Sequence, residues 1–279
     1  MDRSLAEIVD ACIEANETEL PVLDQTAMRV HELTQSDDYD AASLESLIRE
    51  EPVLTAAVLR LANSSFYGGL SQITSVRDAI VRLGSQKVSS VVIAVTQRES
   101  YKMRDPGLQA VLSKLWHHSI TCALGSAWLA DRLDRKDLTD HAFMAGMLHD
   151  LGKLLILRVV DDLKVSEADF DPPMPLVHQI LDAMHADRGA MLMAKWNIPQ
   201  VYADVVARHH DPNFGDDETL LLLVRLVDLA CNKIGVGVQE KPDTKVAASA
   251  EAQVLGVSDV MAAELEILLE DASGVAGLV

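Results

Sequence analysis

The sequence predicts an all-α protein built as a two-lobed helical domain, and three observations support this fold class. Apolar residues recur at the helical spacing of three and four positions through most of the 279 residues. Strand-like alternation of apolar and polar residues is scarce. Proline and glycine interrupt the helical pattern, most clearly at "DPG" (105–107), and we place the division between the lobes near residue 105.

The first lobe begins with two short helical patterns. Ser43 is a candidate N-cap for a helix over 43–50, and Pro52 suits the first turn of the next helix. The apolar faces at 54–61 and 76–83 each need a partner surface. We therefore expect the two lobes to share one continuous core.

Two further helices are predicted before residue 105. "SVRDAIVRLG" (75–84) is the clearest one, with Ser75 and Asp78 at its start and Gly84 at its end. "KVSSVVIAV" (87–95) is rich in β-branched residues, which favour strands. Its valines nevertheless fall at i, i+3, i+4 and i+7, a spacing typical of one helix face, and the run is predicted to be helical.

The second lobe and the tail follow the same pattern. Helices are expected around 108–134, 139–150, 174–184, 185–195, 199–210 and 217–234, and a last amphipathic helix is expected near 258–270. A proline loop at 172–175 and "HHDPNFGDD" (209–217) separate some of them.

Composition excludes several functional classes. Acidic residues outnumber basic ones 43 to 24, for a net charge of −19, and aromatic residues make up only 4%. Phosphate-backbone binding needs Lys and Arg, so nucleic acid is not an expected partner. No run approaches the ~20 apolar residues of a membrane span, and the N-terminus lacks the pattern of a signal peptide. Three cysteines far apart fit a reducing compartment, so we expect a cytoplasmic protein without membrane association.

Histidine and aspartate residues gather in the second lobe. All histidines except His31 lie between residues 117 and 210, and "AGMLHDLGK" (145–153) places His149 beside Asp150. Imidazole and carboxylate are ligand types suited to Fe, Mn or Zn. Lys153 follows His149 by four residues and would project from the same helix face. The candidate metal ligands are His149, Asp150, His185, His209, His210 and Asp228, together with one of the adjacent pair His117 and His118.

Each candidate also has a structural interpretation. A single inward His149 is more often a hydrogen-bonded core residue than a ligand, and His209 and His210 end a helix, where the dipole favours histidine without any function. His117 and His118 are adjacent, so at most one is expected to face inward. Asp228 within an apolar helix is harder to explain in this way, because a buried unpaired carboxylate is costly.

The order of these motifs resembles a known superfamily. "HHS" (117–119), then "HDLGK" (149–153), then the later "H", "HH" and "D" look like the HD superfamily of metal-dependent phosphohydrolases. With them, "ELPVLDQTAMRVHELTQ", "SLIREEPVLTAAVLRLANSSFYG", "ITSVRDAIVRLG" and "WNIPQVYADVVARHHDP" resemble the HDOD domain. The likeness spans about residues 19–234, with a first helical lobe at 19–105 and an HD-like lobe at 106–234. It leaves an N-terminal helix at 1–18 and a polar linker with a C-terminal helix at 235–279.

The resemblance implies an all-helical regulatory or interaction module of bacterial signalling, for example a response-regulator output domain. The HD ligand pattern falls on His118, His149, Asp150 and Asp228, and the added ligands of two-metal HD enzymes fall on His185, His209 and His210. Lys153 matches the lysine of the pattern and would be catalytic only in an enzyme. The chain departs from cyclic-di-GMP phosphodiesterases because "HHDPNFGDD" contains no GYP signature.

Two functions therefore remain open. The first is a module that binds signalling proteins, with a homodimer and a nucleotide-type ligand as further options. The second is a metal-dependent phosphohydrolase, in which a bound cation activates water and Lys153 steadies a phosphoryl group. One or two divalent ions (Fe, Mn, Zn, Ni or Mg) would suit the ligands in either case, or the site holds no metal. An intermediate case is a metal site retained for structure or for ligand sensing. Because no receiver domain precedes the HDOD-like region, the input is expected to come from another chain or a small ligand.

Overall fold

The computed structural model describes residues 4–15, 26, 29–30, 33–34, 40–63, 72–97, 102–167, 169–196, 198–238 and 240–276. Over these residues the chain consists of helices joined by turns and short loops, and contains no strand. The all-α prediction is therefore confirmed. His31 and the whole segment "SSFYGGL" (64–70) lie outside the described residues.

In the described part of the first lobe, four short helices have defined bounds: α3 (Ala41–Glu50), α4 (Pro52–Ala62), α5 (Val76–Leu83) and α6 (Ser85–Gln97). The β-branched run 87–95 lies in α6, which confirms the helical prediction, and its four valines at helical spacing are buried: Val88, Val91, Val92 and Val95. Burial of one helix face has outweighed the strand preference of valine.

The caps of two of these helices come from short polar side chains. Asp40, and not Ser43, caps α3, because its carboxylate accepts from the backbone N–H groups of Ala42 (3.0 Å) and Ser43 (3.1 Å). The predicted cap was therefore wrong by three residues. At α5 the backbone N–H of Asp78 donates to Ser75 Oγ at 3.0 Å, as its sequence indicated.

The second lobe is formed by longer helices. These are α7 (Pro106–Arg132), α8 (Thr139–Leu148), α9 (Leu151–Ser166), α10 (Met174–Lys195), α11 (Gln200–Arg208) and α12 (Thr219–Lys233), with a 3₁₀ turn at Lys136–Leu138. Two predictions need correction. No helix was expected at 151–166, whereas α9 occupies these residues. The two helices expected at 174–184 and 185–195 form one continuous helix, because no helix-breaking residue stands between them.

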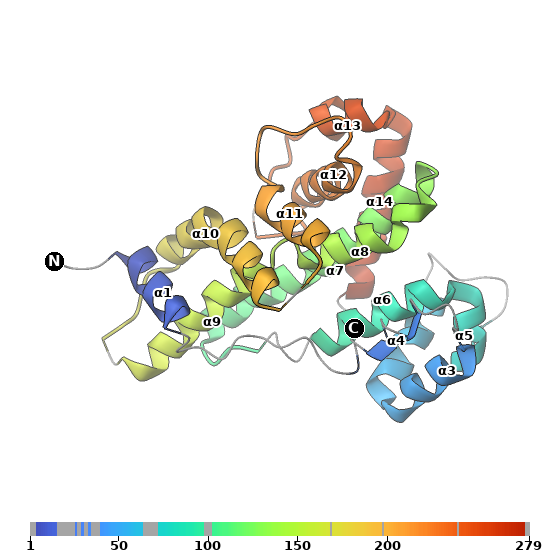
Figure 1. Ribbon diagram of the computed structural model, residues 1–279, viewed down its shortest axis with the longest axis horizontal. Coiled ribbons are helices and arrows are strands. Elements are labelled where there is room, and N and C mark those ends of the chain that lie inside the picture. Colours follow the sequence, from blue (N-terminus) through green and yellow to red (C-terminus); the bar gives the residue numbers. More distant parts are fainter. Residues whose placement is uncertain are drawn as a thin grey trace.

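The remaining helices cover this second lobe (Figure 1). α1 (Leu5–Glu14) contacts α9 and α10, and α14 (Asp259–Ala276) lies along α7. α13 (Ala250–Leu255) and a 3₁₀ turn at Val246–Ala248 connect α12 to α14. No described helix is long and apolar enough to cross a bilayer.

Among the described residues, the two lobes have separate hydrophobic cores, so the expectation of one continuous core was wrong. The first core gathers side chains from 30 to 95, and the second gathers side chains from α1 and from 108 to 269. The lobes meet where α6 contacts α8. Each apolar face finds its partner within its own lobe, because short connections favour neighbouring helices.

Candidate metal centre

Six consecutive helices of the second lobe supply the predicted site residues. His118 lies on α7, His149 ends α8, Asp150 begins α9 with Lys153 in its first turn, and His185 lies on α10. His209 and His210 follow the last turn of α11, and Asp228 lies on α12. Residues separated by up to 110 positions are brought to one place.

Two glycines of "AGMLHDLGK" allow this convergence. A Cβ atom on Gly146 would lie 2.7 Å from the carbonyl oxygen of Cys122 on α7, and a Cβ atom on Gly152 would lie 1.9 Å from the carbonyl oxygen of His185 on α10. Because glycine has no Cβ, α8 approaches α7 and α9 approaches α10 closely enough to present His149 and Asp150 beside the other side chains.

Four of the histidines use the same hydrogen-bond arrangement. The Nδ1 atom of each lies 2.7–3.0 Å from a backbone carbonyl oxygen, in the pairs His118–Val236, His149–Gly146, His185–Leu181 and His209–Val206. A carbonyl only accepts, so each Nδ1 carries the proton and each Nε2 is directed elsewhere. This is the arrangement in which histidine ligates metals, with the outer nitrogen held by the backbone.

The Nε2 atoms of His118 and His149 meet at the first end of the cluster. They lie 3.2 Å apart, and His118 Nε2 is also 3.2 Å from Asp228 Oδ1. Asn232, one turn after Asp228, donates to the same Oδ1 atom at 3.0 Å. His118, His149 and Asp228 are all buried.

The second end of the cluster repeats this pattern. The Nε2 atoms of His185 and His209 lie 3.2 Å apart, and the ring of His210 contacts both. Asp150 stands between the two ends: its Oδ2 is 3.6 Å from the Nε2 atoms of His118 and His149, and its Oδ1 is 3.5 Å from that of His185 and 3.7 Å from that of His209.

Burial and neighbouring charges determine the protonation of the cluster. Burial lowers the pKa of His149 and of His185 to about 4, so both rings are neutral at pH 7. Burial opposes the charge on His118 as well, but the Cys122 sulfur and the Asp228 carboxylate raise its pKa well above 6.5. Burial also opposes the charge on Asp150, yet Lys153 and the surrounding histidines hold its pKa well below 3.8.

A pocket of about 250 Å³ opens onto the cluster. Lys153 lies at its wall and forms an ion pair of 2.7 Å with Asp150 Oδ2. The lining residues are His118, Asp150, Lys153, Asp182, His185, His210, Asp228, Asn232, Val238 and Lys241. His149 and His209 lie beneath this surface, and His210 is exposed at it.

The structure brings together all seven predicted ligands and Lys153, and it adds residues that the sequence analysis missed. Cys122 and Asn232 lie one helical turn after His118 and Asp228, so i, i+4 spacing was the signal that would have found them. Lys241 and the Val236 carbonyl come from the polar segment after α12, where no sequence signal pointed to the site. His141 and His117 lie outside the cluster; for His117 this agrees with the expectation that at most one of the adjacent pair His117 and His118 faces inward.

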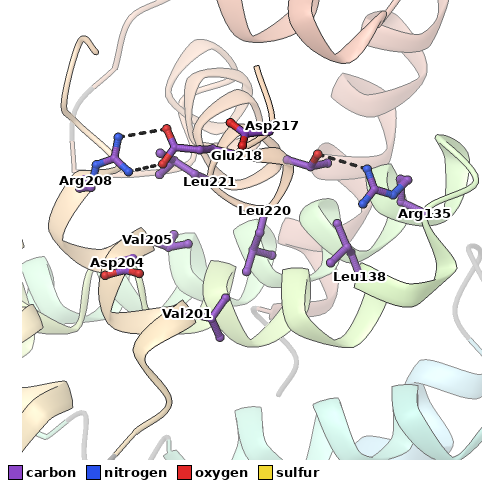
Figure 2. A pocket seen from close by; sticks show the side chains of 11 residues that line it. Arg135, Leu138, Val201, Asp204, Val205, Arg208, Asp217, Glu218, Leu220 and Leu221 are labelled. Carbon is purple, nitrogen blue, oxygen red and sulfur yellow. Dashed lines mark hydrogen bonds and ion pairs between the residues drawn. The ribbon is translucent and has the colours of Figure 1, made fainter. Parts of the chain in front are cut away.

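A second pocket, of about 290 Å³, lies away from this cluster between the turn at 135–138, α11 and the start of α12. Figure 2 shows its apolar floor with Leu138, Val201 and Leu220, and the arginines on its rim. Arg208 is held by a two-point ion pair with Glu218, and Arg135 donates to Thr219 Oγ1 at 3.2 Å. Both arginines therefore already have partners, and none of the predicted ligands lines this pocket.

The donors of the cluster fit divalent metal ions. The ligand atoms divide into two groups, each within 4.8 Å of one another: His118, Cys122, His149 and Asp228, and then Asp150, His185, His209 and His210. Asp150 Oδ1 is buried and has no hydrogen-bond partner. The neutral His185 directs a lone pair toward His209, an arrangement that a cation between them would stabilise. An unpartnered carboxylate oxygen facing imidazole nitrogens is what a metal site requires.

Comparison with known proteins identifies the family. The chain belongs to the HDOD domain family, whose match covers residues 20–212. A protein of Treponema pallidum (strain Nichols), described as uncharacterized, is 21% identical over 198 residues, which are 69% of this chain and 38% of that protein. The chain thus spans well under half the length of this relative.

Solved structures share the fold. An HDOD domain protein of unknown function from Geobacter sulfurreducens and a candidate metal-dependent phosphohydrolase from Shewanella amazonensis SB2B each give a TM-score of 0.75 with 98% of both chains covered, at 22% and 18% identity. A candidate signal transduction protein from Marinobacter aquaeolei VT8 gives 0.63 at 21% identity, with 100% of this chain and 62% of that chain covered. At these identities the likeness shows the fold.

Proposed function

We propose that this protein is a regulatory module of signal transduction, which acts by binding partners and holds divalent metal at the histidine–aspartate cluster. One observation carries the proposal. The first lobe has its own core and reaches the second lobe through α6 and α8, and α8 ends at His149 inside the cluster. A change at the cluster therefore has a direct structural route to the first lobe.

Burial of the cluster supports the same function. His149 is 0% exposed, and His185 and His209 are 2% and 3% exposed, so the protein surrounds these ligands almost completely. Divalent cations bound to ligands from these six helices would link the helices to one another. A two-state element that a ligand biases is what a switch needs, and α8 with the turn at 149–150 is our candidate for that element.

The test compares the full chain with and without bound metal. The purified protein is analysed for Fe, Mn, Zn, Ni and Mg, and amide hydrogen exchange is measured before and after chelation. We expect metal to be present and chelation to increase exchange in both α8 and α6. The internal control is α3, whose main contacts among the described helices are with α4, α5 and α6 of its own lobe. Faster exchange confined to the ligand-bearing helices, with α6 unchanged, would contradict the coupling.

The pocket favours a second candidate, a metal-dependent phosphohydrolase. Lys153 is positively charged beside Asp150, and the pocket reaches both ends of the cluster. A divalent cation there would lower the pKa of a bound water, and Lys153 and Lys241 would attract a phosphoryl oxygen. Hydrolysis of phosphodiester and nucleotide substrates by the metal-loaded protein at ~1 s⁻¹ or faster, the lower range of typical enzymes, would favour this candidate over the module.

The partners and the cellular compartment are also part of the proposal. We infer signalling proteins as partners and a cytoplasmic setting, from the acidic composition and the absence of paired cysteines. The division into 1–18, 19–234 and 235–279 also stays a proposal. Among the described residues, α1 of the first segment and α14 of the last segment pack against the core of the second lobe.

A further inference from the structure

Cys122 lies at the first end of the cluster, one helical turn after His118 on α7. It is fully buried, and its Sγ atom is 3.6 Å from His118 Nε2. The same sulfur lies within 4.8 Å of the ligand atoms of His149 and Asp228. A thiol, two imidazoles and a carboxylate thus surround one point in the interior.

The separations match the edges of one coordination sphere. Bond lengths of about 2.3 Å to sulfur and 2.0–2.1 Å to nitrogen or oxygen place tetrahedral ligand atoms roughly 3.3–3.6 Å apart. The distances from His118 Nε2 are 3.6 Å to the sulfur, 3.2 Å to His149 Nε2 and 3.2 Å to Asp228 Oδ1.

The second group of donors is complete without Cys122. Asp150, His185, His209 and His210 also form a set of four, on the other side of the cluster. Asp150 is therefore available to the second set, and Cys122 supplies the fourth donor of the first. Two ions side by side would then have chemically different surroundings.

We infer that Cys122 ligates one of the two metal ions of the cluster, together with His118, His149 and Asp228. This inference rests on the proposed metal centre and deepens it by naming the class of metal. A thiolate ligand selects zinc, iron or cobalt over the hard cations magnesium and calcium. The thiol proton is released to solvent when the metal–sulfur bond forms.

Cys231 provides a matched control. It is also fully buried, it faces Cys122 from α12 with the sulfurs 3.6 Å apart, and it is absent from the group of donors around His118. If Cys122 served only to pack the interior, these two cysteines would behave alike toward metal.

The experiment uses cobalt(II) chloride with the full chain, stripped of metal by a chelator and kept reduced. Cobalt bound to a thiolate absorbs strongly in the near ultraviolet, whereas cobalt bound only to nitrogen and oxygen does not. We expect this band in the native sequence and in the double variant Cys12→Ser with Cys231→Ser, where Cys122 is the last cysteine. We expect it to be lost in Cys122→Ser, with cobalt affinity at the first site reduced at least tenfold.

The outcomes separate the two proposals. Cobalt binding without the band in the native sequence would overturn the role of Cys122 and leave the metal centre intact. Absence of any cobalt binding would overturn both. Loss of the band in the double variant, while it survives in Cys122→Ser, would assign the sulfur to another cysteine. Because the native sequence and the double variant already decide the matter, the test does not depend on the folding of Cys122→Ser.

Discussion

The Nε2 atoms of His185 and His209 lie 3.2 Å apart, although both rings already use Nδ1 against backbone carbonyl oxygens. Asp150 Oδ1 faces the same two nitrogens and has no hydrogen-bond partner. The convergence of three hydrogen-bond acceptors in the protein interior is unfavourable unless a cation or a proton lies among them. We therefore expect a metal ion bound among these three atoms to stabilise the fold.

Removal of metal is expected to destabilise the protein. A metal present at about 100 times its dissociation constant contributes roughly 2.7 kcal/mol, which corresponds to a Tm shift of about 5–10 °C for a chain of this size. Calorimetry with and without a chelator measures it. His185→Ala should reduce the response, because it removes a ligand of the second group of donors, whereas His141→Ala should keep it, because His141 is exposed and pairs with Tyr202 away from the cluster. Equal responses of the two variants would contradict a role for the cluster.

Replacement of Gly152 by alanine is expected to disrupt the site through the backbone. The added Cβ would lie 1.9 Å from the His185 carbonyl oxygen, so α9 and α10 must separate. We expect the free energy of unfolding to fall by about 3 kcal/mol or more. We also expect the affinity for metal to fall. Urea denaturation measures the first and metal titration the second.

Gly274→Ala is the matched control for this substitution. No atom lies within 4 Å of the position that its Cβ would occupy, and the residue is exposed near the end of α14. Alanine favours a helix over glycine, so this variant should keep or slightly raise stability. A Gly152→Ala protein as stable as the control would show that α9 and α10 are not held in close contact.

Stability of the chelated protein is expected to fall as the pH falls from about 6.5 to about 4. His149 and His185 have a pKa of about 4 in the folded state, so in this window the unfolded chain binds protons that the folded chain does not. The opposite holds for His118, whose raised pKa contributes stability below 6.5 that is lost as the pH rises through its folded value. Urea midpoints at pH 6.5, 5.5 and 4.5 measure the slope.

His149→Gln tests the assignment of this pH dependence. It removes one of the three histidines whose folded-state pKa is about 4 (His149, His185 and His210), so the midpoint should vary less steeply with pH than in the native sequence. Parallel curves for the two proteins would mean that His149 does not titrate far below its ordinary pKa in the folded state.

Signalling is expected to survive without turnover at the cluster. The double variant His149→Ala with Asp150→Asn removes two ligands on neighbouring helix ends, and it is expressed in the parent organism in place of the native gene. If the module acts through binding surfaces, the folded variant retains output, although the dependence of that output on metal is lost with the two ligands. Complete loss of output from the folded variant, combined with phosphodiester hydrolysis at enzymatic rates by the native protein, would replace the module with the hydrolase.

The helical fold was predictable because the spacing of apolar residues is a local property. Valines at 88, 91, 92 and 95 share a face in any helix, whatever surrounds it, and tertiary burial then reinforced that choice over the strand preference of valine. The same local argument failed at 174–195. Two expected helices there are one, because the sequence marks a helix end only where a breaking residue stands.

The sequence by itself determined the helical class and the set of histidines and aspartates that converge, because residue type and order carry that information. Tertiary structure alone decided which side chains complete the set. Cys122 meets the ligand atoms of His149 and Asp228 because α8 and α12 pack against α7. The Val236 carbonyl reaches His118 across 118 positions because the segment after α12 turns back toward α7. Tertiary structure also decided that each lobe closes its own core. Contacts between distant positions depend on how the helices pack, and linear spacing does not encode that packing.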